Sequence, residues 1–336
     1  MWDLWLSHTF QASVVVADDM GVFTALDQTA ATATELAGRL DFDERATSVL
    51  VRLLASLDLL VARDHRYHLT DHARVYLVRS SPFYWGHMMR VGLNEWQQST
   101  LTAALKKKDS AHAAGPEGTP LPSGTGRSVD GWAQGDIVSD RAEGIAAAMH
   151  SHSLLPAIST ARNYDFTGIR RILDVGGGSG CFMIAIAQAH PEMRCTILEL
   201  PSMCAVAQRY IDESGVSDRV DTRAVDMFRQ KWPQGYDGVF FSNIWHDWNV
   251  RTCTWLAERT FEILPRGGRI LLHEMLVDDA GGGPATPAGF SMLMLLVTQG
   301  QQFSFGELKA LLEGVGFTGV ETRPTSHYYS ITTGYK

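Results

Sequence analysis

A strand followed at once by a glycine-rich loop and a helix constrains the fold of this chain more than any other feature. Residues 170–180 read RRILDVGGGSG, in which a short apolar run reaches Asp174 and four of the next six residues are glycine. The apolar stretch CFMIAIAQAH follows and predicts a helix. Glycine permits positive φ and close approach of a ligand, and a helix N-terminus offers unpaired N–H groups. The segment predicts a ligand-binding loop or, taken alone, a tight turn.

The spacing of the glycines distinguishes two kinds of binding loop. The dinucleotide pattern G-x-G-x-x-G, begun at Gly176, requires glycine at position 181, where this chain has Cys181. The observed pattern is D-x-G-x-G-x-G, which places glycine at Gly176, Gly178 and Gly180. We expect this spacing to suit a nucleoside with an amino-acid tail rather than a pyrophosphate.

Acidic residues lie at the ends of the next two predicted strands. The strand RCTILEL carries Glu199, 25 residues after Asp174, and VDTRAVDMF ends at Asp226, Met227 and Phe228. An acid at the end of the second strand is placed to accept hydrogen bonds from both ribose hydroxyls. Asp226 is a candidate acceptor for an adenine amino group, with Met227 or Phe228 against the ring. Each acid alone is also a common strand-end cap, but the ordered set predicts binding of S-adenosylmethionine.

The first hundred residues predict a helical domain. Thr34 is the expected N-cap of one helix, and Asp41 or Asp43 that of the next. Two short strands are expected around Asp64-His65, which completes the helix, helix and hairpin order of a winged helix. The second helix carries one apolar stripe at Val49, Leu53, Leu57 and Leu60. With 12 acidic against 8 basic residues in these hundred positions, we expect a packing or dimerisation module rather than a DNA reader.

The chain of 336 residues is long enough for two domains. We expect a winged-helix-like dimerisation domain over 1–105, a Gly- and Pro-rich linker over 106–136, and a catalytic domain over 137–336. From residue 170 strands and helices alternate, which indicates a parallel sheet.

Charge and cysteine content exclude several classes of protein. The formal charge of −8 disfavours a nucleic-acid or anionic-membrane surface. The four cysteines form no C-x-x-C pattern and are expected to be free thiols in the cytoplasm. Neither a signal peptide nor a membrane-spanning segment is expected.

A histidine stands where the fourth predicted strand, GYDGVFFSNIW, ends. His246 is therefore expected just past the C-terminal edge of the sheet, over the cofactor. A histidine with an ordinary pKa of about 6.5 accepts a proton near neutral pH. His246 is a candidate general base, and the alternative is a structural histidine. Asp247 is expected to cap the next helix, and Trp248 to pack nearby.

Six motifs occur in a fixed order from residue 149 onward: LDVGGGSG, LELP, VDMF, HDW, LPRGGRILLHE and ELKALLEGVGF. In this order they resemble the plant-type and actinobacterial small-molecule O-methyltransferases, which include the caffeate and acetylserotonin enzymes. The N-terminal winged helix matches more loosely. The resemblance implies an α/β, Rossmann-like class I methyltransferase domain whose seven-stranded sheet has an antiparallel last strand, with HYYSITTGY in the final hairpin. It also implies S-adenosyl-L-methionine as cofactor and a homodimer formed by the N-terminal domain, which lines part of the substrate pocket.

The resemblance assigns His246 as the general base and Glu274, at the end of GRILLHEM, as the carboxylate that orients it. Gln302 stands where the family has a second glutamate. An amide can hydrogen-bond there but cannot stabilise an imidazolium by charge. His273, next to Glu274, is expected to point to the opposite face of the sheet as a core residue.

The remaining candidate residues form two groups. Those expected to hold the cofactor are Asp174, Gly176, Gly178, Gly180, Glu199, Leu200, Asp226, Met227, Ser242 and Ser153. Those expected to meet the substrate are Met149, His152, Trp245, Phe290 and Met294. Met149, His152 and Ser153 belong to the stretch MHSHS, which also resembles a family segment, although plain helix packing remains open for Met149.

These residues predict methyl transfer to a small aromatic or conjugated hydroxyl of a secondary-metabolite intermediate. Methylation of an activated ring carbon, or of a carbon alpha to a carbonyl, remains open because the same base and cofactor serve it. Two further alternatives are a cofactor-binding relative with a non-methylating activity and an acidic regulator fused to a ligand sensor. No metal is expected, since the histidines lack the spacing of a metal-binding helix pair.

Overall fold

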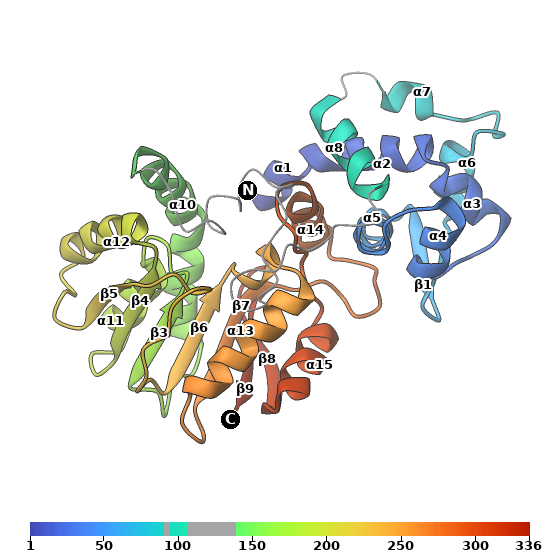
Figure 1. Cartoon of the computed structure of the whole chain (residues 1–336). Coiled ribbons are helices and arrows are strands. Elements are labelled where there is room, and N and C mark those ends of the chain that lie inside the picture. Colours follow the sequence, from blue (N-terminus) through green and yellow to red (C-terminus); the bar gives the residue numbers. More distant parts are fainter. Residues whose placement is uncertain (91–94, 107–138) are drawn as a thin grey trace. The chain divides into compact units, whose positions relative to one another are not determined.

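The computed structural model describes residues 1–90, 95–106 and 139–336, and these form two compact units (Figure 1). The N-terminal unit comprises Met1–Ala111 and Leu276–Ser304, and the C-terminal unit comprises His112–Met275 and Phe305–Lys336. The linker predicted over 106–136 lies outside the described residues, except for Lys106 at the end of a helix.

The N-terminal unit is helical with one small hairpin. Its elements are α1 (Trp2–Leu6), α2 (His8–Asp19), α3 (Val22–Gln28), α4 (Ala33–Leu40), α5 (Glu44–Ser56), β1 (Leu60–Arg63), β2 (Arg66–Leu69), α6 (Asp71–Leu77), α7 (Gly86–Met89), α8 (Glu95–Lys106) and α14 (Ala285–Val297). The predicted order of helix, helix and hairpin is confirmed in α4, α5 and β1–β2. Asp64 and His65 form the two-residue turn, both with positive φ, as tight hairpin turns require.

The predicted cap of α4 is wrong by two residues. Thr32 caps this helix, because its Oγ1 accepts the Glu35 N–H at 3.1 Å while the Glu35 carboxylate accepts the Thr32 N–H at 3.1 Å. This reciprocal arrangement satisfies two N–H groups that the helix leaves unpaired, whereas Thr34 lies inside the first turn. Asp43 caps α5 as predicted, accepting the Ala46 N–H at 2.8 Å.

One late segment packs with the N-terminal helices, which differs from the contiguous boundaries expected from the sequence. Helix α14 is apolar on nearly all sides, and such a helix must be buried. Its residues Ala288, Met292, Leu295 and Leu296 join the core formed by α2, α5 and α8. The region expected as one catalytic domain over 137–336 is therefore interrupted at Leu276–Ser304.

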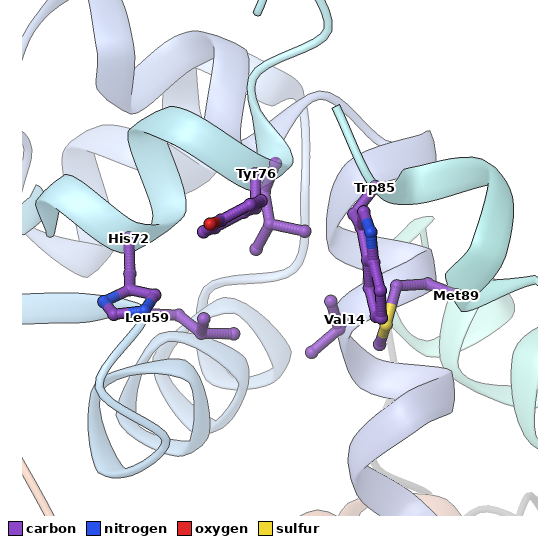
Figure 2. A pocket seen from close by; sticks show the side chains of 7 residues that line it. Val14, Leu59, His72, Tyr76, Trp85 and Met89 are labelled. Carbon is purple, nitrogen blue, oxygen red and sulfur yellow. The ribbon is translucent and has the colours of Figure 1, made fainter. Parts of the chain in front are cut away.

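The N-terminal unit also contains a largely apolar pocket of about 450 Å³. Figure 2 shows its walls, with His72 and Tyr76 on one side and Trp85 and Met89 on the other. The full lining is Val14, Leu59, His72, Tyr76, Leu77, Trp85 and Met89.

The C-terminal unit is built on a seven-stranded sheet in the order β5-β4-β3-β6-β7-β9-β8. The strands β5, β4, β3, β6 and β7 pair in parallel, and β9 runs antiparallel to both of its neighbours, β7 and β8, so the predicted fold with an antiparallel last strand is confirmed. The strands are β3 (Arg171–Val175), β4 (Arg194–Glu199), β5 (Val220–Ala224), β6 (Gly238–Ser242), β7 (Arg269–Met275), β8 (Thr318–Ser326) and β9 (Tyr329–Tyr335).

Helices cover both faces of this sheet (Figure 1). Helices α10 (Ser139–Asn163), α11 (Cys181–Ala189) and α12 (Pro201–Glu213) pack together near β4 and β5. Helices α13 (Val250–Ile263) and α15 (Phe305–Val315) pack on each other and against β7 to β9.

Two further predictions concern the cysteines and the membrane. All four cysteines are free and buried, as expected for reduced thiols. Within the described ranges, no helix has the length and apolar character needed to cross a bilayer.

Candidate active site

The order in which successive strands are added to the sheet of the C-terminal unit reverses between β3 and β6. These two strands are neighbours, although β4 and β5 come between them in the sequence and extend the sheet the other way. In open α/β sheets, ligands bind beyond the carboxyl ends of the strands at such a switch point. The glycine loop follows β3, and His246 lies in the short 3-10 turn η2 (Trp245–Asp247) after β6, so both lie at this edge.

The glycine loop needs glycine for two separate reasons. Gly176, Gly178 and Gly180 all have positive φ, at 74°, 57° and 77°. A Cβ on Gly176 would also lie 2.6 Å from Ile244 Cδ1, and one on Gly180 would lie 2.5 Å from Ile197 Cδ1. The loop is thus packed directly against the chain that leads into η2, which places it beside His246.

Two acids lie beside the loop, the partly buried Glu199 and the buried Asp174, and Glu199 binds its backbone. Glu199 accepts the Gly178 N–H at 3.2 Å and the Leu200 N–H at 2.7 Å. Burial raises the pKa of Glu199, against the lowering effect of these N–H groups. Burial and the charge of Glu199 raise the pKa of Asp174 well above its usual range, and Asp174 Oδ1 has no partner within the described chain. Such a pair of carboxylates favours a ligand that brings hydroxyl donors and positive charge.

The other predicted cofactor residues lie close by, with their polar groups already engaged. The strand β5 ends at Ala224, so Asp226 follows it in a turn, where its carboxylate accepts the Phe228 N–H at 2.9 Å and pairs with Arg229 at 2.6 Å. Ser242 is hydrogen-bonded to His273 at 2.9 Å. Their assignments, with that of Met227, remain predictions.

His246 and Glu274 meet as the sequence suggested. His246 Nδ1 lies 3.0 Å from Glu274 Oε2, and both side chains are almost fully buried. The other carboxylate oxygen, Oε1, accepts the N–H groups of Ile244 at 3.1 Å and Trp245 at 3.0 Å. Glu274 therefore fixes both the turn that carries the histidine and the ring itself. Nε2, the nitrogen opposite this contact, is the one that can accept a proton.

The charges around His246 set its basicity. Burial lowers its pKa, but the Glu274 carboxylate and then Asp247 more than offset this, so the pKa is raised. Asp247 Oδ1 lies 3.7 Å from His246 Nε2, too far for a hydrogen bond. Burial raises the pKa of Asp247 to about 7 against the lowering effect of His246.

Helix α10 brings the predicted substrate residues Met149 and His152 into this unit. His152 Nε2 lies 3.4 Å from Met149 Sδ, and Ser153 Oγ lies 3.3 Å from His152 Nδ1. Burial, and secondarily the proximity of His246, lower the pKa of His152 to about 4. The helix thus presents a neutral imidazole to the same site as His246, together with the exposed Met149.

The remaining predicted residues fall into two groups. Trp245 is fully buried with its ring edge-on to Phe241, which is a core position. Phe290, Met294 and Gln302 belong to the N-terminal unit, where all three are buried. The backbone N–H of Gln302 donates to Ser291 Oγ at 3.0 Å. The roles proposed for these four residues stay predictions.

Sequence reasoning misassigned one residue and missed another. Asp247 does not cap α13, because Asn249 does so by accepting the Thr252 N–H at 3.0 Å. His273 behaves as predicted, stacked on Tyr329 at 4.7 Å between ring centroids on the face away from Glu274. His150, next to the predicted Met149, was not singled out although it contacts the glycine loop. The MHSHS stretch was its only signal, because the contact crosses from α10 to a loop 29 residues away.

S-adenosylmethionine fits the groups present at this edge. Its ribose diol would meet the carboxylate of Glu199, and its positive charges would favour the ionised form of the unpaired Asp174 oxygen. The N–H groups of Gly176, Gly178 and Gly180 are bonded to the Leu198 carbonyl, the Glu199 carboxylate and the Gly177 carbonyl, so these glycines allow close approach of a ligand rather than offering free donors. Within the described ranges, no cluster of three or more His, Cys, Asp or Glu side chains is arranged to hold a metal ion.

Comparison with known proteins gives consistent matches. Residues 125–318 match a family model described as an O-methyltransferase domain, and residues 2–79 match an O-methyltransferase dimerisation domain. The chain is 32% identical over 319 residues to 3-hydroxy-5-methyl-1-naphthoate 3-O-methyltransferase of Streptomyces sahachiroi, covering 95% of this chain and 88% of the relative. It is 27% identical to acetylserotonin O-methyltransferase of Bos taurus, covering 98% and 96%. A crystal structure of an O-methyltransferase family 2 protein from Planctomyces limnophilus in complex with apigenin has a TM-score of 0.83 at 27% identity, covering 100% and 94%.

Proposed function

This chain belongs to the O-methyltransferase family and is an S-adenosylmethionine-dependent O-methyltransferase, and we propose that it methylates a small aromatic or conjugated hydroxyl with His246 as the general base. The observation that carries the proposal is the 3.0 Å contact between His246 Nδ1 and Glu274 Oε2, beside the glycine loop. A carboxylate on Nδ1 fixes the tautomer in which Nε2 is the acceptor.

When bound, the cofactor supplies an electrophilic methyl group on a sulfonium. The protein's own residues remove the hydroxyl proton and align the oxygen with the methyl group. His246 accepts this proton at Nε2, and the negative charge of Glu274, 3.0 Å from Nδ1, stabilises the resulting imidazolium. The neutral His152, whose pKa is held near 4, adds no competing positive charge when His246 is protonated. Burial of this region excludes water that would otherwise weaken these interactions.

The substrate class is supported by the relatives. Two are named for O-methylation of a hydroxynaphthoate and of acetylserotonin, and the third was solved with apigenin. All three compounds are aromatic and carry hydroxyl groups. We extend this to a secondary-metabolite intermediate. The match to a dimerisation domain supports a homodimer through the N-terminal unit.

A screen with methyl-labelled cofactor tests the proposal. Purified protein is incubated with a panel of phenols, and each labelled product is analysed by proton NMR, in which an O-methyl signal lies well downfield of a C-methyl signal. An O-methyl product supports the proposal, whereas a C-methyl product supports the ring-carbon alternative.

The role of His246 is tested with the substrate that the screen identifies. His246→Ala should lower turnover by about 10²–10⁴, the usual contribution of a general base. Its affinity for S-adenosylhomocysteine should remain close to wild type, because the glycine loop and Glu199 are intact. A folded variant with full turnover would exclude His246 as the base.

A further inference from the structure

One histidine outside the catalytic pair joins three separate elements at the glycine loop. His150, on α10, is hydrogen-bonded through Nδ1 to Ser179 Oγ at 2.9 Å. Its ring is also stacked on Tyr210 of α12, with centroids 4.4 Å apart and an angle of 15° between the planes. Ser179 stands between Gly178 and Gly180, so the contact lies within the part of the loop that has positive φ.

The surrounding packing fixes His150 in this position. Ala146, one turn earlier on α10, is fully buried in a small apolar cluster with Leu200, Met203 and Val206, and Tyr210 packs against the same cluster. Two anchors one turn apart therefore hold this part of α10 against α12. His150 is the point at which that helix pair reaches the loop.

The loop has a physical need for such a contact. A glycine-rich segment has more conformational freedom to lose than any other sequence, so holding one conformation is costly. Glu199 restrains it from one side through the Gly178 N–H at 3.2 Å, and Ser179 is almost fully buried beneath α10. If the binding-competent conformation falls to a tenth of the population, the apparent affinity falls tenfold.

We propose that His150 is a positioning residue for cofactor binding, because its hydrogen bond to Ser179 and its stack on Tyr210 hold the glycine loop in the conformation that receives S-adenosylmethionine. The inference rests on the proposed location of the cofactor at this loop. The same helix carries Met149 and His152 one turn or less away, so α10 connects the cofactor loop to the side chains expected at the substrate.

His150→Phe tests the hydrogen bond while retaining a ring to stack on Tyr210. Calorimetry with S-adenosylhomocysteine should show Kd about tenfold higher than wild type. With substrate, KM for the cofactor should rise by a similar factor, whereas kcat at saturating cofactor should fall less than threefold. In the cofactor-free protein, amide hydrogen exchange at Gly178–Gly180 should become faster.

Four further variants separate positioning from general stability. Ser179→Ala should give the same loss of affinity, and the double variant should lose no more than either single one, since one bond is removed in all three. His190→Phe is the matched control, because His190 Nε2 also bonds to α10, at the Ala161 carbonyl at 2.8 Å, but does not reach the loop. His190→Phe should leave Kd unchanged. Glu199→Ala reports on the cofactor location itself.

The outcomes are distinct. Wild-type affinity in His150→Phe together with weakened affinity in Glu199→Ala would overturn the role of His150 alone. Equal losses in His150→Phe and His190→Phe would show a general structural effect and would also overturn it. Wild-type affinity in both His150→Phe and Glu199→Ala would overturn the cofactor location on which the inference rests.

Discussion

Replacing Glu274 by glutamine should reverse the tautomer of His246 without changing the shape of the site. Glu274 Oε1 accepts two backbone N–H groups, from Ile244 and Trp245, while Oε2 faces His246 Nδ1. In Glu274→Gln, only the amide oxygen can take the place of Oε1, because an NH2 group there would face two donors. The amide NH2 must then point at Nδ1. Nδ1 becomes an acceptor, the ring proton moves to Nε2, and the substrate hydroxyl loses its base.

The size of the effect follows from this geometry. A base in the wrong tautomer forfeits most of general base catalysis, so kcat should fall by about 10²–10⁴, which is roughly 3–5 kcal/mol in the barrier. The lost attraction between a carboxylate and an imidazolium 3.0 Å away is of the same order, about 5.5 kcal/mol as an upper bound at an effective dielectric of about 20. The loss should shrink at high pH, where a phenol ionises without help.

The assay is turnover at saturating cofactor and substrate, combined with nitrogen NMR of histidine-labelled protein to assign the proton on His246. Affinity for S-adenosylhomocysteine should stay within about threefold of wild type. Glu313→Gln, the same chemical change in an exposed pair with Lys309, serves as the control and should retain full turnover. A Glu274→Gln variant with wild-type kcat, or with Nε2 still unprotonated, would refute the reasoning.

Three other predictions follow from the same structure. Glu199→Ala should weaken S-adenosylhomocysteine binding by about 1–3 kcal/mol, measured by calorimetry, and an unchanged Kd would mean that another acid holds the ribose. Burial lowers the pKa of His273 to about 3, so below pH 6.5 the unfolded chain takes up a proton that the folded chain does not, and stability falls as pH drops. His273→Phe, which keeps a ring on Tyr329, should therefore lose less stability than wild type between pH 7 and pH 5 in urea titrations, and equal losses would contradict this. Sedimentation should show a dimer at micromolar concentration, because residues 2–79 match a dimerisation domain, and a monomeric wild type would contradict this.

Much of the C-terminal unit follows from local sequence pattern. The strands β3, β4, β6 and β7 each contain a short apolar run, whereas β5 (Val220–Ala224) is mostly polar. The residue types at the carboxyl ends of these strands are specific enough to predict one shared edge. Glycine at positions 176, 178 and 180 is required by backbone conformation, which is a property of the residue itself. The pairing of His246 with Glu274 is implied by the family resemblance, and the structure gives its geometric reason, since the parallel strands β6 and β7 are neighbours and end at the same edge.

The tertiary structure alone determined two things: which of two chemically similar neighbouring residues takes a role, and which residues far apart in the sequence are in contact. Thr32 rather than Thr34, and Asn249 rather than Asp247, cap their helices, because the cap depends on the direction from which the chain enters. The sequence of α14 is apolar and predicts a buried helix wherever it packs. Only the tertiary structure shows that it packs with the N-terminal helices. The contact of His150 with Ser179 has no periodic signal, since it depends on how α10 lies over the loop. Adjacent residues determine the local conformational preference of the chain. Which elements pack together depends instead on the free energy of the whole folded unit.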